Sequence, residues 1–181
     1  LGVDIPEGVI SDYESVVDQV DELSIAQRER VTRHDVKARL DEFSELAGHE
    51  YAHMAMTSRD LTENVEQMQV RDGLVLLRER VAATLSRLAR LAVENRELVM
   101  VGRSHNVAAQ ATTLGKRFAN AGQELLVAFD GLEDLIVRYP LRGLKGPVGT
   151  QQDQLDLLEG DAANLARLES SVATHLGFEA V

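Results

Sequence analysis

Apolar residues recur at steps of three and four positions along most of the chain, which is the spacing of an amphipathic helix. The clearest run comprises Leu74, Leu77, Val81, Leu85, Leu88 and Leu91. From about Ser58 to Leu98 there is one glycine and no proline, so we expect one helix of about 40 residues, roughly 60 Å long at 1.5 Å per residue. A second long helix is predicted from about Ala109 to Arg138, because Pro140 then interrupts the pattern. Apolar and polar residues nowhere alternate for long, and no Asn-Gly or Asp-Gly pair joins two alternating runs as a hairpin turn would, so the predicted fold class is all-α.

Shorter helices are predicted on either side of the long ones. The first runs from Pro6 to about Val20, and Ser24 is expected to cap the second. Asp35 is expected to cap a third through Leu46, which Gly48 ends. Residues 140–150 form a loop rich in proline and glycine, and two short helices follow at about 151–158 and 161–175. Because a chain of this size can hardly cover two long helices, we expect partner helices from an oligomer.

Composition narrows the classes of function. The chain has 181 residues and a formal charge of −11, which argues against binding to nucleic acid or to an anionic membrane. No apolar run approaches the roughly 20 residues of a membrane span. The sequence has no cysteine, which excludes disulfides, thiol nucleophiles and thiolate metal sites and fits a reducing compartment.

Four short polar segments interrupt the helical pattern and are the candidates for chemistry. They are Thr32–Asp35, Thr57–Asp60, Gly102–Asn106 and Lys145–Gln151. Each is placed at a helix end or in a loop, where free N–H groups favour anions. Residues 101–150 carry a net charge of +2, whereas the remainder carries −13. We therefore expect an anionic ligand, although capping alone would also explain the Thr, Ser and Asp residues, and a buried histidine would explain His105.

One further motif suggests a metal. His49, Glu50 and His53 match the HExxH pattern of zinc proteases, which needs both histidines on one helix face and a third ligand. Gly48 directly precedes the motif, and Arg59 stands where a third histidine would fall. We therefore expect no metal site here.

The polar segments, read in order, carry a resemblance to a known family. RHDVKA (33–38), HMAMTSRDLTEN (53–64), GRSHNVAAQATTLGKR (102–117) and KGPVGTQ (145–151) resemble blocks of the fumarase/aspartase superfamily, and within it the adenylosuccinate lyase family of actinobacterial type. The resemblance implies the rest of a small helical N-terminal domain over 1–57 and the first half of a central long-helix bundle over 58–181. It further implies a cytoplasmic homotetramer that removes fumarate from the nucleotide adenylosuccinate and from SAICAR, with no metal or organic cofactor.

The same resemblance implies roles for individual residues. His105 matches the general acid. The matches to substrate-binding positions are Arg33, His34, Asp35, His53, Thr57, Ser58, Asn64, Ser104, Lys145 and Gln151. In the third block, Val107 stands where the superfamily has glutamine, and Ser104 keeps the hydroxyl of the usual threonine.

Family members are more than twice this length. The mobile loop that carries their general base has no counterpart here, nor does their N-terminal Arg-Tyr segment. We therefore expect a piece of a longer enzyme, inactive by itself. Two alternatives remain open: a sister lyase acting on argininosuccinate, fumarate or a carboxymuconate, and a helical assembly protein without catalysis.

Overall fold

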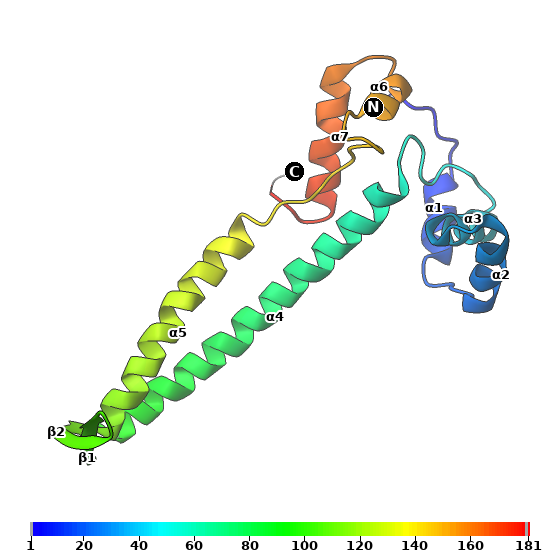
Figure 1. Cartoon of the computed structure of the whole chain (residues 1–181). Helices are drawn as coiled ribbons and strands as arrows, with labels where there is room; N and C mark the ends of the chain where they lie inside the picture. The colour runs from blue at the N-terminus through cyan, green and yellow to red at the C-terminus, as the bar shows by residue number, and fades with distance from the viewer. Residues whose placement is uncertain (1, 180) are drawn as a thin grey trace. The chain divides into compact units, whose positions relative to one another are not determined.

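The computed structural model describes residues 2–179 and 181, and it is largely helical (Figure 1). The elements in chain order are α1 (Val9–Val16), α2 (Glu22–Thr32), α3 (Asp35–Ala47), α4 (Ser58–Glu94), β1 (Val99–Ser104), β2 (Val107–Thr113), α5 (Leu114–Val137), α6 (Gln152–Leu157) and α7 (Ala162–His175). The all-α prediction is confirmed, with a two-stranded sheet as the exception. The chain forms two compact units, residues 1–68 with 140–181 and residues 69–139.

The first unit holds the buried apolar residues. Helix α3 packs on both α1 and α2, and α6 packs on α7. The buried apolar side chains are Val9, Val16, Val36, Ala38, Leu141, Leu144, Leu158, Ala173 and Phe178. Tyr13 ties α1 to the segment after α3: its hydroxyl donates to the His49 carbonyl and accepts from the N–H groups of Tyr51 and Ala52.

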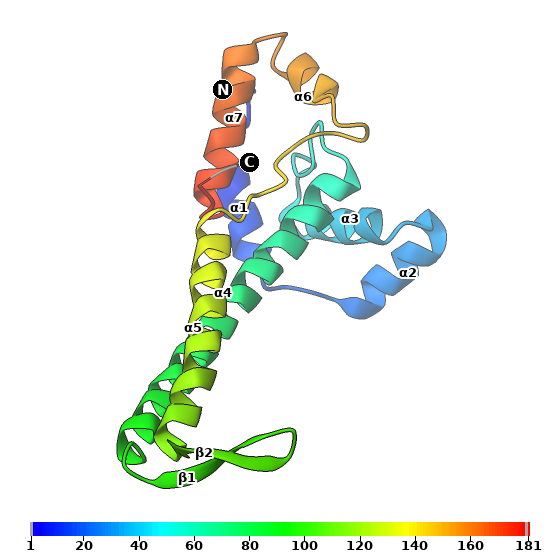
Figure 2. The ribbon, with the colours of Figure 1, turned by 60° about the vertical axis from the view of Figure 1, so that its left-hand side comes forward.

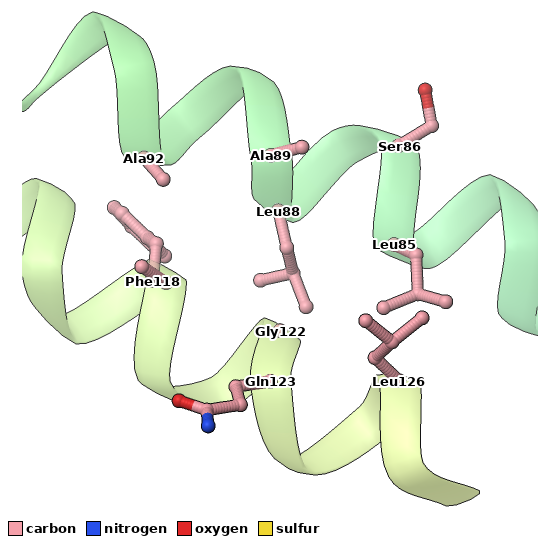
Figure 3. A pocket seen from close by; sticks show the side chains of 10 residues that line it. Leu85, Ser86, Leu88, Ala89, Ala92, Phe118, Gly122, Gln123 and Leu126 are labelled. Atoms are coloured by element: carbon pink, nitrogen blue, oxygen red, sulfur yellow. The ribbon is translucent and has the colours of Figure 1, made fainter. Parts of the chain in front are cut away.

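The second unit is an antiparallel helix pair closed by a hairpin. From residue 69 onward, α4 lies beside α5, and Gly115 is the one buried residue among those described in this unit. A groove of about 660 Å³ runs between the helices. Leu85, Leu88, Phe118 and Leu126 point into it, whereas Ser86 points away (Figure 3). Large apolar side chains such as Leu77 remain half exposed, so this unit leaves apolar surface uncovered.

The hairpin corrects two predictions. The second long helix begins at Leu114 rather than Ala109, and the first ends at Glu94 rather than Leu98. Residues Val99–Ser104 and Val107–Thr113 instead pair as antiparallel strands, with a bulge at Gly102/Arg103. Figure 2 shows this hairpin projecting away from the end of the α4–α5 pair. Most of its residues are exposed, so no buried face imposed the alternation that would have revealed it.

Helix ends follow capping chemistry, with several changes from the predicted residues. Asp21, rather than Ser24, caps α2 by accepting from two backbone N–H groups. His34, rather than Asp35, caps α3 through Nδ1, and Gly48 ends α3 in the left-handed region at φ 74° as predicted. Helix α1 is shorter than predicted, because it begins at Val9 and ends at Val16. Helices α6 and α7 fall within a residue of their predicted bounds.

Among the described residues, none of the helices combines the length and hydrophobicity that crossing a lipid bilayer requires.

Candidate functional site

Thr57 and Lys145 meet around one buried carboxylate. Thr57 precedes α4 and Ser58 begins it, so both lie at a helix N-terminus. The backbone N–H of Thr57 donates to Asp60 Oδ2 at 3.0 Å, and that of Lys145 donates to Asp60 Oδ1 at 2.9 Å. Asp60 itself is 1% exposed. The structure therefore joins two predicted substrate-binding segments that are far apart in sequence.

Gln151 closes the loop that contains Lys145. Its backbone N–H donates to the Lys145 carbonyl at 3.1 Å, and its side-chain Nε2 donates to the Leu144 carbonyl at 2.9 Å. The Lys145 ammonium pairs with Glu169 of α7, which neutralises its charge in this arrangement. The segment 145–151 is thus an ordered turn rather than a loose connection.

Asn64 is hydrogen-bonded to the backbone of the same loop region. It is 5% exposed, and its Nδ2 donates to the Gly143 carbonyl while its Oδ1 accepts from the Gly143 N–H, each at 2.9 Å. Both ends of the amide are therefore engaged with backbone. The observed role of Asn64 is to hold the loop, and its contact with a substrate stays a prediction.

Arg33, His34 and Asp35 lie together at the junction of α2 and α3. Arg33 is the C-cap of α2 and His34 the N-cap of α3. His34 Nδ1 accepts from the Lys37 N–H at 3.3 Å and lies 3.6 Å from Asp35 Oδ1. The His34 side chain is 48% exposed, so a ligand can reach it.

His53 lies in the turn before α4, at the wall of a polar groove. The groove measures about 780 Å³ and is also lined by Arg28, Lys37, Asp41 and His49. His53 Nε2 is enclosed and lacks a hydrogen-bond partner among the described residues. An enclosed nitrogen without a partner is costly, so it marks a place where a substrate, a water or another chain would be bound.

Ser104 and His105 lie in the second unit, at the tip of the β1–β2 hairpin. His105 and Asn106 form the two-residue turn with φ values of 50° and 62°, which is the left-handed geometry that hairpin turns favour. Arg103 braces the turn by donating to the Asn106 carbonyl at 3.0 Å. Both Ser104 and His105 are exposed. The hydrogen bonds described here do not connect them to the Asp60 network.

Left-handed backbone coincides with the candidate residues. Among the described residues, positive φ at non-glycine positions occurs at Arg33, His53, Ala55, His105, Asn106, Gln151 and Glu159. Four of these seven, namely Arg33, His53, His105 and Gln151, are predicted site residues. At Arg33 and His105 the conformation follows from a helix C-cap and a hairpin turn, so His53 and Gln151 are the two candidates at which left-handed backbone points to a local constraint.

Sequence reasoning missed the residues that organise the loop. Asp60 and Arg142 form an ion pair, and Gln154, which is 1% exposed, donates to the Ala55 carbonyl at 2.6 Å. Asp60 lies within the polar segment Thr57–Asp60, where capping alone would explain an aspartate. Its partners Arg142 and Lys145 lie more than 80 residues away, so no local pattern identifies them.

The electrostatics of Asp60 follow from its surroundings. Burial raises the pKa of its carboxyl, but the N–H groups of Lys145, Thr57 and Gly146 and the Arg142 guanidinium outweigh that effect. The pKa therefore lies below its ordinary value, and the group is a carboxylate at neutral pH.

The HExxH segment does not form a zinc-protease helix. His49 and His53 lie in the irregular stretch between α3 and α4, and His49 Nε2 pairs with Asp12 of α1 at 2.8 Å. In the described part of the chain, no group of three or more histidines and carboxylates is placed to hold a metal ion.

Comparisons with known proteins agree with this architecture. The family model described as lyase matches residues 7–173. Adenylosuccinate lyase of Schistosoma mansoni is 35% identical over 99% of this chain, which covers 38% of that relative. The Caenorhabditis briggsae adenylosuccinate lyase is 33% identical over 96% of the chain, which covers 37% of it. The chain thus spans under two fifths of the length of these relatives.

Solved structures support the fold. The fumarate lyase of Mesorhizobium sp. BNC1 matches with a TM-score of 0.82 at 23% identity, covering 97% of this chain and 41% of that one. The 3-carboxy-cis,cis-muconate lactonizing enzyme of Pseudomonas putida matches with a TM-score of 0.82 at 18% identity, covering 98% and 40%. At these identities the likeness concerns the arrangement of the helices.

Proposed function

Because the chain belongs to the lyase family, we propose that it is part of an adenylosuccinate lyase, which eliminates fumarate from adenylosuccinate to leave AMP. The related cleavage of SAICAR to AICAR at the same site is part of the proposal. The observation that carries it is the 35% identity to an adenylosuccinate lyase along 99% of the chain. The proposed role is in purine biosynthesis in the cytoplasm.

The chemistry fits the candidate residues. Removing a proton next to a carboxylate builds negative charge on that carboxylate, which fixed donors must stabilise as it forms. Thr57 and Ser58, at the positive end of α4, are the proposed donors. His105 is the proposed general acid for the departing nitrogen, since imidazole exchanges protons near neutral pH. The proposed general base is outside this chain.

A nucleotide substrate needs several anion-binding groups at once. In the proposal, His34 and His53 supply ring nitrogens, Ser104 supplies a hydroxyl and Gln151 an amide. Arg33 supplies positive charge near the ligand, Lys145 forms part of the loop that carries Gln151, and Asp35 and Asn64 complete the set by holding neighbouring groups.

Assembly of the site is proposed to need several copies of the chain. The helix pair of the second unit exposes apolar side chains along its length, as a helix of an oligomeric bundle does. Ser104 and His105 lie on an exposed hairpin of that unit. We propose a homotetramer in which the hairpin of one copy meets the Thr57 and Gln151 segments of others.

The test uses the protein encoded by the complete reading frame around this chain. Purified protein should release fumarate from adenylosuccinate, followed by absorbance, and His105→Ala should lower kcat by about 10²- to 10⁴-fold. The matched control is His175→Ala, at an exposed position in the last turn of α7, which should keep the wild-type rate. Absence of fumarate release would refute the assigned substrate, and a near-normal rate in His105→Ala would refute the acid role.

Parallel assays separate the alternatives. Argininosuccinate and carboxymuconate, offered to the same protein, should remain unchanged, and turnover of either would favour a sister lyase. The 181-residue chain by itself should show no turnover, because the proposed base lies outside it.

A further inference from the structure

Asp60 gathers donors from several separate segments onto one carboxylate. It accepts from the backbone N–H of Thr57 at 3.0 Å, of Lys145 at 2.9 Å and of Gly146 at 3.1 Å, and it pairs with the Arg142 guanidinium. Thr57 belongs to the Thr57–Ser58 segment, and Lys145 and Gly146 belong to the loop that leads to Gln151. The donors therefore come from both segments that carry proposed substrate contacts. Few side chains other than a fully buried carboxylate could accept from so many N–H groups.

The same face of α4 continues this attachment. Asp60, Asn64 and Gln67 follow at intervals of four and three residues, so they lie along one side of the helix. Asn64 forms its two bonds with the Gly143 backbone, and Gln67 Oε1 accepts from the Arg142 N–H. The backbone from 142 to 146 is therefore bonded to α4 at successive positions, and Asp60 occupies the end nearest Thr57.

We propose that Asp60 is a positioning residue: it holds the Thr57–Ser58 segment and the Lys145–Gln151 loop in one fixed arrangement and so sets substrate affinity without touching the substrate. The proposal rests on the proposed function for its kinetic consequence. Its structural part, the ordering of the loop, stands independently of which substrate is bound.

The charge of Asp60 is essential to this role. Replacing it by asparagine keeps the shape but presents an NH₂ group to N–H donors, so at least one contact becomes donor against donor. The Arg142 guanidinium would also lose a buried partner, although Glu63 still pairs with its Nε. The loop should therefore loosen while the helices around it persist.

The decisive experiment compares Asp60→Asn with Glu63→Gln in the complete protein. Glu63 is a matched control, since it pairs with the same arginine but makes none of the described contacts with the backbone of residues 143–151. For Asp60→Asn we expect KM for adenylosuccinate to rise about 10-fold or more with kcat within about 3-fold, because lost uniform binding appears in KM. Glu63→Gln should leave both within about 3-fold of wild type.

Hydrogen exchange supplies a readout that does not depend on activity. Amides of residues 142–151 should exchange about 10-fold faster or more in Asp60→Asn than in Glu63→Gln, with protection of α5 unchanged. Equal exchange in the two variants would overturn the positioning role. A wild-type protein without lyase activity would refute the proposed function instead, and the exchange comparison would still decide the structural part.

A milder variant covers the case in which Asp60→Asn does not fold. Gln67→Met removes the acceptor for the Arg142 N–H, farther along the same face. It should raise both KM and exchange of residues 142–146 about 3-fold. No change in either quantity would overturn the proposal.

Discussion

Gly115, in the first turn of α5, lies against the backbone at the end of α4, and replacing it by alanine should destabilise the helix pair. A Cβ at Gly115 would clash with the Ala92 carbonyl oxygen and lie 2.8 Å from both N and Cα of Arg96. These are backbone atoms, which cannot turn aside as a flexible side chain could. The Gly115 N–H also donates to the Asn95 carbonyl at 2.9 Å, so moving the helix away would break this bond.

The size of the effect follows from two opposing terms. Forcing a methyl group into a filled space costs typically about 1–3 kcal/mol. Alanine gains up to about 1 kcal/mol over glycine inside a helix, and less in the first turn where Gly115 lies. We therefore expect Gly115→Ala to lower the free energy of unfolding by about 1–2 kcal/mol.

Gly122→Ala on the same helix is the matched control, and it should raise the free energy of unfolding rather than lower it. Its Cβ would lie 3.7 Å from Leu88 Cβ, an ordinary contact, so the helix propensity gain of about 0.5–1 kcal/mol should remain. Thermal unfolding at one protein concentration should place the midpoint of Gly115→Ala several degrees below that of Gly122→Ala, at roughly 2–4 °C per kcal/mol. Equal midpoints, or the reverse order, would refute the inferred close contact.

Two further predictions concern the first unit. Tyr13→Phe should lower the free energy of unfolding, measured by urea titration, by about 1–3 kcal/mol, because the His49 carbonyl and the N–H groups of Tyr51 and Ala52 lose their shared partner. As a control, Tyr139→Phe in the same titration should stay within about 0.5 kcal/mol of wild type. The lowered pKa of Asp60 means that its stabilising contribution is complete above the ordinary value of 3.8 and is lost as the pH falls through the lower folded value. The difference in unfolding free energy between wild type and Asp60→Asn should accordingly be constant from pH 5 to 7 and shrink below about pH 3.8, and a constant difference at all pH values would contradict the shift.

The long helices could be predicted because their signals are local. A 3.6-residue period without proline identifies α4 and α5, and Gly48 identifies the end of α3. The hairpin could not be predicted, because its strands are mostly exposed and its turn uses His105 and Asn106 in place of the usual Asn-Gly. Helix α1 was predicted too long because Val17 and Val20 continue the apolar pattern, although both side chains are exposed.

For the candidate site, the motifs identify residue types, but the contacts that hold them arise from distant parts of the chain. Thr57, Lys145 and Gln151 were found from their segments, whereas Asp60 became visible only when the fold brought Lys145 to it. The left-handed conformation of Gln151 likewise has no sequence signal. It accompanies the bonds from its N–H and its amide to carbonyls of residues 145 and 144.

The two parts of the proposed site, the Thr57 and Lys145 segments and the hairpin that carries His105, are therefore built in different ways. The Thr57 and Lys145 segments are attached to a buried carboxylate within one unit, so their geometry is set before any ligand or partner binds. His105 stands on a hairpin whose strands are bonded to each other and whose tip is exposed. An exposed general acid would protonate a leaving group poorly in open water, since electrostatic catalysis needs a site from which water is excluded. In the proposed oligomer, the apolar faces of α4 and α5 would supply the association energy, and the enclosure of His105 by neighbouring copies would follow from it.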